Sequence, residues 1–272
     1  MSFEPKPADV MKLRNETGLP MMECKKALIE TQGDVEKAKD LLRKKLGAKM
    51  DARSDRAAGE GRVAVAVGAD GRAAAIVELR AETDFTAKND GFVSMAKAVA
   101  EMALAEHDGE VALSEGIKKA VDGVRISTGE NVSYARGHKL SGGGQTAFGS
   151  YIHHDGKLGV LLQGEGSLSE ETLRSICMHI AASPITPQGI TPNDIPQHIA
   201  DKERTFAIEQ AMESGKPREI AEKMVEGKMR KFFEEVALLE QPFVMDPTKK
   251  VKEMLPKDAS IVAFLRWKVG QG

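Results

Sequence analysis

The chain of 272 residues has few cysteines and few aromatic residues. It contains one tryptophan and two cysteines, Cys24 and Cys177, and aromatic residues make up 4% of the sequence. Two cysteines this far apart form no CxxC pair, which excludes a thiolate metal cluster and a disulfide framework. Such sparing use of cysteine is typical of a reducing compartment. We therefore expect a cytoplasmic protein.

The sequence also lacks an excess of charge of either sign and lacks long apolar runs. Its 39 Lys and Arg residues nearly balance 41 Asp and Glu residues, which gives a formal net charge of −2. A general nucleic-acid binder needs a basic face and usually aromatic stacking platforms. No run of about 18 apolar residues occurs, and the N-terminus has no basic segment followed by an apolar one. We expect no direct contact with nucleic acid and none with a membrane.

What is present begins with a helical pattern over residues 8–46, within a predicted domain of residues 1–47. The pattern is interrupted at Thr17-Gly18-Leu19-Pro20 and at Gln32-Gly33-Asp34. Glycine is favoured just past a helix end, while proline and aspartate suit the start of the next helix. These residues predict a three-helix domain with a limited core. Residues 48–61 carry charge, alanine and glycine without a sustained apolar stripe, which indicates a linker.

A strand pattern follows and then recurs. Val63, Val65 and Val67 alternate with smaller or polar residues, and Asp70-Gly71 predicts a hairpin turn before a second strand and a helix. The same layout returns with the turn at Asp155-Gly156, the helix over 170–182 and a closing strand over 260–269. The pattern predicts an α+β fold with a duplicated antiparallel-sheet and helix core. Its two subdomains comprise residues 62–140, and residues 141–190 with 240–272.

Residues 191–239 interrupt the second subdomain with two helical runs. A break at Ser214-Gly215-Lys216-Pro217 separates the runs, and Ile195, Ile199 and Phe206 mark the apolar side of the first. The spacing predicts an inserted antiparallel helical hairpin. A hairpin of two helices buries little apolar surface by itself, so we expect it to pack against the core, against a second copy or against a partner.

Groups that would carry covalent chemistry or hold a metal are difficult to find. Gly142-Gly143-Gly144 is followed by no Lys-Ser or Lys-Thr pair and by no helix, which favours a plain loop over a phosphate site. His153 and His154 lie at the end of a predicted strand, where successive side chains point to opposite faces. We expect no metal, no cofactor and no enzymatic activity, and this favours a protein that works by contact.

Two segments are candidates for contact with a partner protein. Phe85 lies in the polar segment 81–90, and two interpretations of it stay open: the ring folds back onto its own sheet, or it projects with Asp84 toward a partner. An exposed phenyl ring forgoes roughly 1.5–3 kcal/mol of burial. Met21 and Met22 begin the second helix of the small bundle. Their pattern alone favours the core, although paired methionines also suit a contact surface.

Five motifs, in order and spanning nearly the whole chain, resemble one known family. They are TGLPMMECKKAL (17–28), TDFTAKN (83–89), MHIAAS (178–183), SGKPREIAEKMVEGKM (214–229) and QPFVMDP (241–247). Together they closely resemble the elongation factor Ts family, the guanine-nucleotide exchange factors for the GTPase elongation factor Tu. The resemblance implies a ubiquitin-associated-like N-terminal domain, and exchange by protein contact without covalent chemistry.

The resemblance also implies which residues carry the function. The segment that intrudes beside the partner's nucleotide site and helps to dislodge Mg²⁺ corresponds to Thr83, Asp84, Phe85 and Thr86, with Thr86 in place of a more usual apolar residue. Residues that contact other parts of the partner correspond to Arg14, Met21, Met22, Lys25, Thr128, Gly129, His153, Val244 and Met245. Some members continue beyond the position of Gly272 into a further helical module, so we expect fewer contacts here.

Two other functions stay open at this point. In one, the chain is a non-catalytic adaptor or scaffold whose three-helix domain binds an unrelated protein. In the other, an enzyme acts on a small molecule at the loop of Gly142 to Gly144. A homodimer through the helical hairpin or the core is a further prediction that the sequence leaves open.

Overall fold

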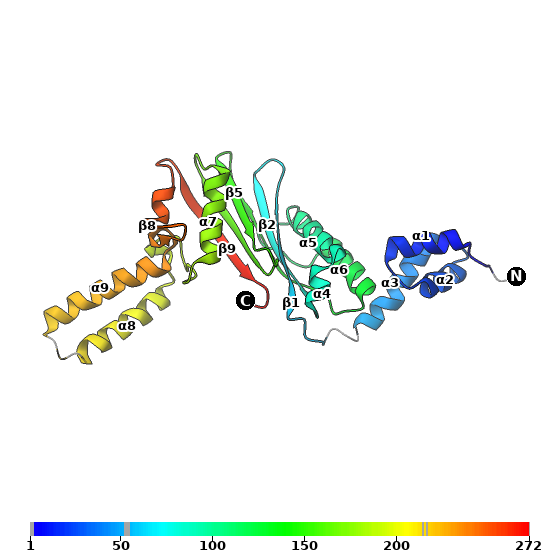
Figure 1. The fold of residues 1–272 in the computed structure, drawn as a ribbon, viewed down its shortest axis with the longest axis horizontal. Helices are drawn as coiled ribbons and strands as arrows, with labels where there is room; N and C mark the ends of the chain where they lie inside the picture. The colour runs from blue at the N-terminus through cyan, green and yellow to red at the C-terminus, as the bar shows by residue number, and fades with distance from the viewer. Residues whose placement is uncertain (1–2, 52–54, 214, 216, 272) are drawn as a thin grey trace.

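The computed structural model describes residues 3–51, 55–213, 215 and 217–271. The molecule is elongated, with a helical bundle at the N-terminal end, two sheets in the middle and a helical hairpin at the other end (Figure 1). This arrangement confirms the predicted α+β fold with its N-terminal bundle, duplicated core and inserted hairpin. Ser214 and Lys216, two of the four residues predicted to separate the hairpin helices, lie outside the described residues.

The N-terminal bundle consists of α1 (Pro7–Thr17), α2 (Met21–Glu30) and α3 (Val35–Asp51). Gly18 ends α1 with a φ of 68° and donates its N–H to the carbonyl of Arg14, as a glycine C-cap does. The buried side chains at the centre of the bundle are Val10, Leu13, Leu19, Cys24, Ala27, Leu28, Ala38 and Leu42.

The third helix is longer than the pattern predicts, because it continues to Asp51. The expected linker over 48–61 is therefore wrong for its first residues, and Ala48, Lys49 and Met50 are all good helix formers. The linker is also shorter at its other end, because β1 begins at Glu60. Residues 52–54 of the predicted linker lie outside the described part of the chain.

The first subdomain has a four-stranded antiparallel sheet in the order β1-β2-β4-β3. Its elements are β1 (Glu60–Val67), β2 (Ala73–Ala81), α4 (Asp84–Lys88), α5 (Asp90–Ala103), β3 (Gly109–Glu110), α6 (Glu115–Thr128) and β4 (Ser133–Ser141). Helices α5 and α6 cover one face of the sheet. The short helix α4 falls in the segment 81–90, for which the sequence predicts no helix.

The second subdomain repeats this plan with a three-stranded antiparallel sheet in the order β5-β6-β9. Its elements are β5 (Thr146–Ile152), β6 (Leu158–Glu165), α7 (Glu170–Ala182), η1 (Pro192–Asp194), η2 (Leu238–Glu240), β7 (Pro242–Phe243), β8 (Asp246–Lys250), η3 (Val251–Met254) and β9 (Ser260–Lys268). The turns before β2 and β6 also match, since Gly71 and Gly156 have φ values of 68° and 74°.

The two sheets pack against each other through their inner faces. Ile76 and Ala74 of β2 meet Leu161 of β6 there, while Val77 and Leu79 point to the opposite face, toward α5. Helix α7 covers the outer face of the second sheet. Strands β2 and β6 are therefore buried on both sides, which explains why their sequences are apolar almost without alternation.

A buried carboxylate also joins the two halves. Glu78 of β2 has no exposed surface and accepts hydrogen bonds from Arg80 Nε at 2.7 Å, from Arg136 Nε at 2.8 Å and from the backbone N–H of Gly270 at 3.0 Å. The Arg136 guanidinium lies 4.4 Å from the ring centre of Trp267 in β9. This cluster fixes the end of β9 to the first sheet.

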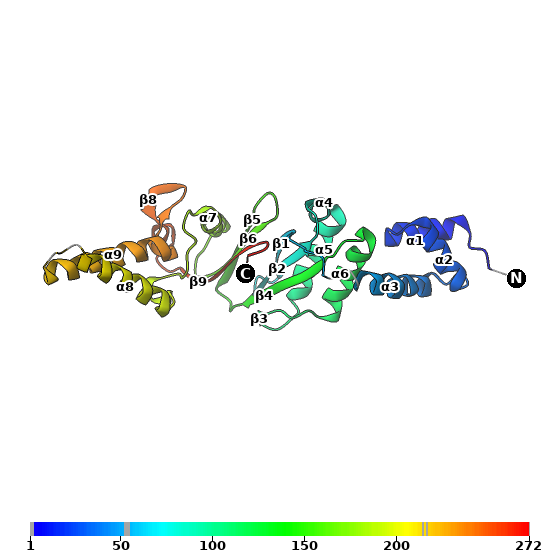
Figure 2. The ribbon, with the colours of Figure 1, turned by 90° about the horizontal axis from the view of Figure 1, so that it is seen from below.

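The helical hairpin consists of α8 (Gln197–Glu213) and α9 (Arg218–Val236). The helices meet through Ala207, Ala211, Val225 and Met229, and the small alanine side chains allow a close approach. The prediction that Phe206 lies on the apolar side of its helix is wrong, because its side chain is 58% exposed. Viewed from below, the hairpin projects from the second subdomain, away from the bundle (Figure 2).

Candidate protein-contact site

The segment Thr83 to Thr86 forms the start of α4, at the edge of the first sheet beside β1 (Figure 1). Thr83 is the N-cap, and its Oγ1 accepts a hydrogen bond from the N–H of Thr86 at 3.3 Å. The same hydroxyl donates to Glu130 Oε1 at 2.7 Å, and the N–H of Thr83 donates to Glu130 Oε2 at 3.1 Å. The Glu130 carboxylate therefore fixes the beginning of α4 to the chain after α6.

Helix α4 buries one side and exposes the other. Thr86 and Ala87 are buried, whereas the side chain of Phe85 is 83% exposed. The interpretation in which the ring folds back onto its own sheet is therefore wrong, although Asn89 does cap the next helix by accepting the N–H of Gly91 at 2.8 Å. Of the four residues, Thr86 faces the protein and Phe85 faces away from it.

The Asp84 carboxylate is held close to a positive charge. Lys88 Nζ donates to Asp84 Oδ2 at 2.6 Å, and this hydrogen bond holds the pKa of Asp84 below its usual value. The charge of Lys157, from the turn between β5 and β6, acts in the same direction. Asp84 is therefore ionised at neutral pH, next to the exposed ring of Phe85.

The turn at Thr128 and Gly129 lies close to this segment. Gly129 ends α6 with a φ of 70°, and Thr128 Oγ1 donates to the carbonyl of Val124 at 2.8 Å. The next residue, Glu130, binds Thr83, so the turn and α4 are held together. The turn also supports the N-terminal bundle, because the neighbouring Ile126 packs against the bundle core.

On the bundle, the predicted contact residues lie on its surface. Met21 and Met22 in the first turn of α2 are 46% and 62% exposed, so the expectation from pattern alone that they join the core is wrong. Lys25 lies one turn further along the helix, with its Nζ 3.8 Å from Glu4 Oε1. Arg14 is exposed on α1.

The structure brings His153, Val244 and Met245 together in one groove of about 470 Å³ in the second subdomain. Met178 of α7 and Arg266 of β9 also line this groove. Val244 and Met245 are 38% and 50% exposed and form the turn between β7 and β8. His153 and the adjacent pair Val244 and Met245, which lie about 90 positions apart in the sequence, therefore share one surface.

His153 and His154 do not point to opposite faces, contrary to the prediction. Strand β5 ends at Ile152, so both residues lie in the following turn, and their ring centres are 4.2 Å apart. His153 Nδ1 lies 3.1 Å from Asp155 Oδ1. No group of three or more His, Cys, Asp or Glu side chains that could hold a metal ion occurs in the described part of the chain.

The cysteines and the loop of Gly142 to Gly144 offer no reactive centre. Cys24 and Cys177 are both buried, and burial raises the pKa of the Cys177 thiol to about 12. A buried thiol with a raised pKa is a poor nucleophile. The glycine loop joins β4 to β5 without a helix after it. Among the described residues, no helix is long and apolar enough to cross a membrane.

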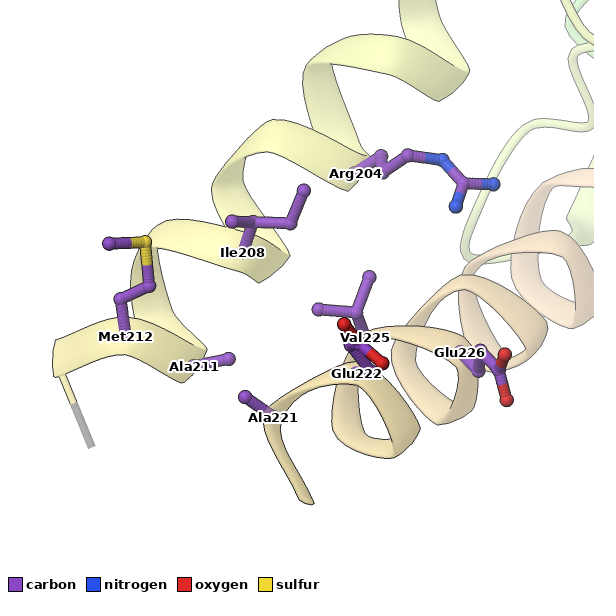
Figure 3. A pocket seen from close by; sticks show the side chains of 8 residues that line it. All are labelled: Arg204, Ile208, Ala211, Met212, Ala221, Glu222, Val225 and Glu226. Atoms are coloured by element: carbon purple, nitrogen blue, oxygen red, sulfur yellow. The ribbon is translucent and has the colours of Figure 1, made fainter. Parts of the chain in front are cut away.

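A groove of about 730 Å³ lies between α8 and α9 (Figure 3). Ala211 and Ala221 point toward one another across it, and Arg204 lies at the end nearer the core. Met212 and Ile208 line the groove and are 73% and 43% exposed. None of the residues that the sequence predicts as contacts lies in the hairpin.

Sequence reasoning missed the residues that hold the contact segments in place. Glu130 binds Thr83 from 47 residues away, and His179 contacts the backbone of Val244 from 65 residues away. The available signal is that His179 lies inside the motif MHIAAS, and that Gln241, which bonds to it, begins the motif QPFVMDP.

The chain is similar to known proteins over nearly its whole length. The family model described as Elongation factor TS matches residues 82–271. The Elongation factor Ts of Photorhabdus laumondii is 42% identical over 265 residues, which cover 97% of this chain and 91% of the relative. The corresponding proteins of Thiobacillus denitrificans and Pasteurella multocida are 42% and 44% identical with the same coverage. Similarity of this extent, over nearly the whole chain, shows that the chain belongs to the elongation factor Ts family.

Proposed function

We propose that this protein promotes the release of GDP from elongation factor Tu by inserting Asp84 and Phe85 beside the bound nucleotide and dislodging Mg²⁺. Membership of the family implies a nucleotide exchange factor that acts on elongation factor Tu. The observation that carries the proposed mechanism is the exposed ring of Phe85, held on a short helix by the carboxylate of Glu130.

The chemistry of a GTPase explains why contact alone is sufficient. Such a protein holds GDP through backbone amides of its phosphate loop, a lysine and a Mg²⁺ ion that neutralises phosphate charge. Displacing the ion or tilting the loop removes a large part of the affinity for GDP. The exchange factor forms no covalent bond and needs no general base.

Phe85 and Asp84 suit the two parts of this task. Burial of the Phe85 ring in a pocket of the partner recovers roughly 1.5–3 kcal/mol of apolar burial that the free protein forgoes. This free energy becomes available only when α4 is inserted. Asp84 brings an ionised carboxylate, which competes for the polar groups that surround the ion.

The other exposed surfaces suit a docking role. We assign Arg14, Met21, Met22 and Lys25 of the bundle to contact with the partner's nucleotide-binding domain. The groove residues His153, Val244 and Met245 contact other domains of the partner, and the turn at Thr128 and Gly129 contributes beside α4. Methionine side chains adapt to irregular surfaces, which suits Met21, Met22 and Met245 to this role.

The reverse step of the cycle follows from linkage. A factor that weakens nucleotide binding is itself weakened by nucleotide to the same extent. GTP, present above its dissociation constant, therefore displaces the factor and completes the exchange.

The test is stopped-flow release of a fluorescent GDP analogue from elongation factor Tu, with and without this protein, over a series of Mg²⁺ concentrations. We expect strong acceleration at millimolar Mg²⁺ and a smaller advantage once EDTA has removed the ion. Acceleration that is independent of Mg²⁺ contradicts dislodging of the ion. Binding without acceleration favours the alternative function of an adaptor.

The predicted homodimer through the hairpin or the core has a separate test. The exposed apolar side chains of the hairpin, Phe206, Ile208, Met212 and Ile220, are the residues that such a contact would cover. Light scattering of the free protein over a concentration series measures its mass directly.

A further inference from the structure

A buried histidine lies behind the turn that carries Val244 and Met245. His179 occupies the last turn of α7 and is 1% exposed. Its Nδ1 accepts the N–H of Val244 at 3.1 Å, and its Nε2 lies 2.9 Å from Gln241 Oε1. The Phe243 ring lies beside it, with the ring centres 5.8 Å apart. Both nitrogens of the imidazole are therefore used inside the protein.

These contacts fix the direction of every hydrogen bond. Because Nδ1 accepts a backbone N–H, the proton of the neutral ring lies on Nε2 and is donated to Gln241 Oε1. The amide nitrogen of Gln241 in turn donates to the carbonyls of Ile185 at 2.9 Å and Glu235 at 2.6 Å. The chain of bonds thus runs from Val244 to the end of α9. Burial lowers the pKa of His179, in keeping with a neutral ring.

The turn itself has little local support. Val244 and Met245 are the two central residues between paired Phe243 and Asp246. The turns that best suit a two-residue hairpin, types I′ and II′, need positive φ at the first central residue. Among the described residues other than glycine, Gln32 alone has positive φ. The hairpin therefore closes without either of these turn types, and the ring of His179 gives it a contact from outside through the N–H of Val244.

We propose that His179 is a positioning residue for partner binding, which orients the exposed side chains of Val244 and Met245 by accepting the N–H of Val244. This inference rests on the proposed function, in which those two side chains contact elongation factor Tu. His179 is buried and does not touch the partner. It acts through the backbone of the turn.

Two substitutions separate this role from simple core stability. In His179→Asn the amide oxygen can take the place of Nδ1 and accept the N–H of Val244, whereas the contact with Gln241 is lost. In His179→Gln the amide reaches Gln241, whereas the acceptor for Val244 is lost. Each variant removes one of the two hydrogen bonds of a buried ring. We therefore expect similar losses of thermal stability.

The variants differ in what they do to the turn. For His179→Gln we expect loss of hydrogen-exchange protection at the Val244 amide in NMR spectra, and affinity for elongation factor Tu·GDP about tenfold lower. For His179→Asn we expect the protection of the Val244 amide and the affinity for elongation factor Tu·GDP to stay close to their values in the unsubstituted protein. Measurements are made on the full chain at a temperature where each variant is folded by circular dichroism.

Several results would overturn the proposal. One is equal affinity of the two variants, and another is an unprotected Val244 amide in the unsubstituted protein, which needs no variant at all. If the unsubstituted protein neither binds elongation factor Tu nor accelerates GDP release, the proposed function fails, and this inference fails with it. If exchange is intact but the two variants do not differ, this inference alone fails.

Discussion

At the scale of single residues, substitution of Phe85 tests partner contact separately from the stability of the fold. Its ring is 83% exposed, so Phe85→Ala removes almost no burial from the folded protein. We expect the midpoint of thermal unfolding to change by less than about 1 °C, because surface substitutions rarely exceed about 0.5 kcal/mol. We expect GDP release from elongation factor Tu to slow by about 10- to 100-fold, since roughly 1.5–3 kcal/mol of burial in the partner is lost.

The matched control is Phe206→Ala, which removes an exposed phenyl ring of the hairpin. It should leave the rate of exchange unchanged. A large drop in thermal stability of the Phe85 variant, with normal exchange per folded molecule, would show that the ring supports the fold and not the contact.

At the scale of elements, α4 depends on its first residue. A helix of five residues is too short to be stable alone, so its cap and its link to Glu130 decide whether it forms. Thr83→Val keeps the branched shape but removes the hydroxyl, which both caps α4 and donates to Glu130. Loss of a cap costs about 1 kcal/mol. We expect faster hydrogen exchange at the Thr86 amide and GDP release slowed about fivefold.

Thr83→Ser is the conservative partner of this variant, because serine keeps the hydroxyl. Its exchange rate should lie close to that of the unsubstituted protein. Equal rates for the serine and valine variants would mean that the cap of α4 does not matter for exchange.

Most of the secondary-structure elements can be predicted from the sequence, and a few cannot. The strands, the turns at Asp70 and Asp155, and the helix over 170–182 follow from periodicity and turn chemistry, which are local properties. Helix α4 does not, because five residues carry no measurable period. The exposed surfaces of Phe85 and Met22 depend on what neighbouring elements cover, and pattern alone favours the wrong answer for Met22.

The residues that hold the candidate site in place cannot be predicted from the sequence, for a different reason. Glu130 and His179 act across 47 and 65 residues, and no local pattern states which partner such a residue meets. Resemblance to a family points to the segments that we propose as contacts, since these form continuous motifs. The contacts that hold the segments in place need the fold.

At the scale of the whole molecule, Glu78 joins the two halves of the core. Glu78→Gln leaves Arg80 and Arg136 without their shared counter-charge in a buried cluster. Removal of one partner from a buried ion pair costs about 3–5 kcal/mol. We expect the free energy of unfolding in urea to fall by about 3 kcal/mol, because both arginines are partly exposed and recover some hydration.

Two probes test this prediction. Trp267, the one tryptophan of the sequence, lies over Arg136 and reports on the joint by its fluorescence, while circular dichroism reports on the helices. Both transitions should move together, because the cluster connects the sheets. Glu165→Gln, at an exposed position of β6, is the control and should change neither. If Glu78→Gln lowers the free energy of unfolding by less than about 1 kcal/mol, the cluster does not hold the two halves together.

The elongated shape has a consequence for how the partner leaves. The bundle, α4 and the turn before β8 follow one another along the molecule, on a core whose halves are joined by buried contacts (Figure 1). In the function proposed above, a partner that dissociates from one of these three surfaces is kept near it by the other two, at a high effective concentration. We therefore expect each contact to open and re-form many times before the complex separates. On the proposed mechanism, nucleotide that binds the partner needs only to prevent the contact at α4 from re-forming, and the remaining contacts then dissociate one after another.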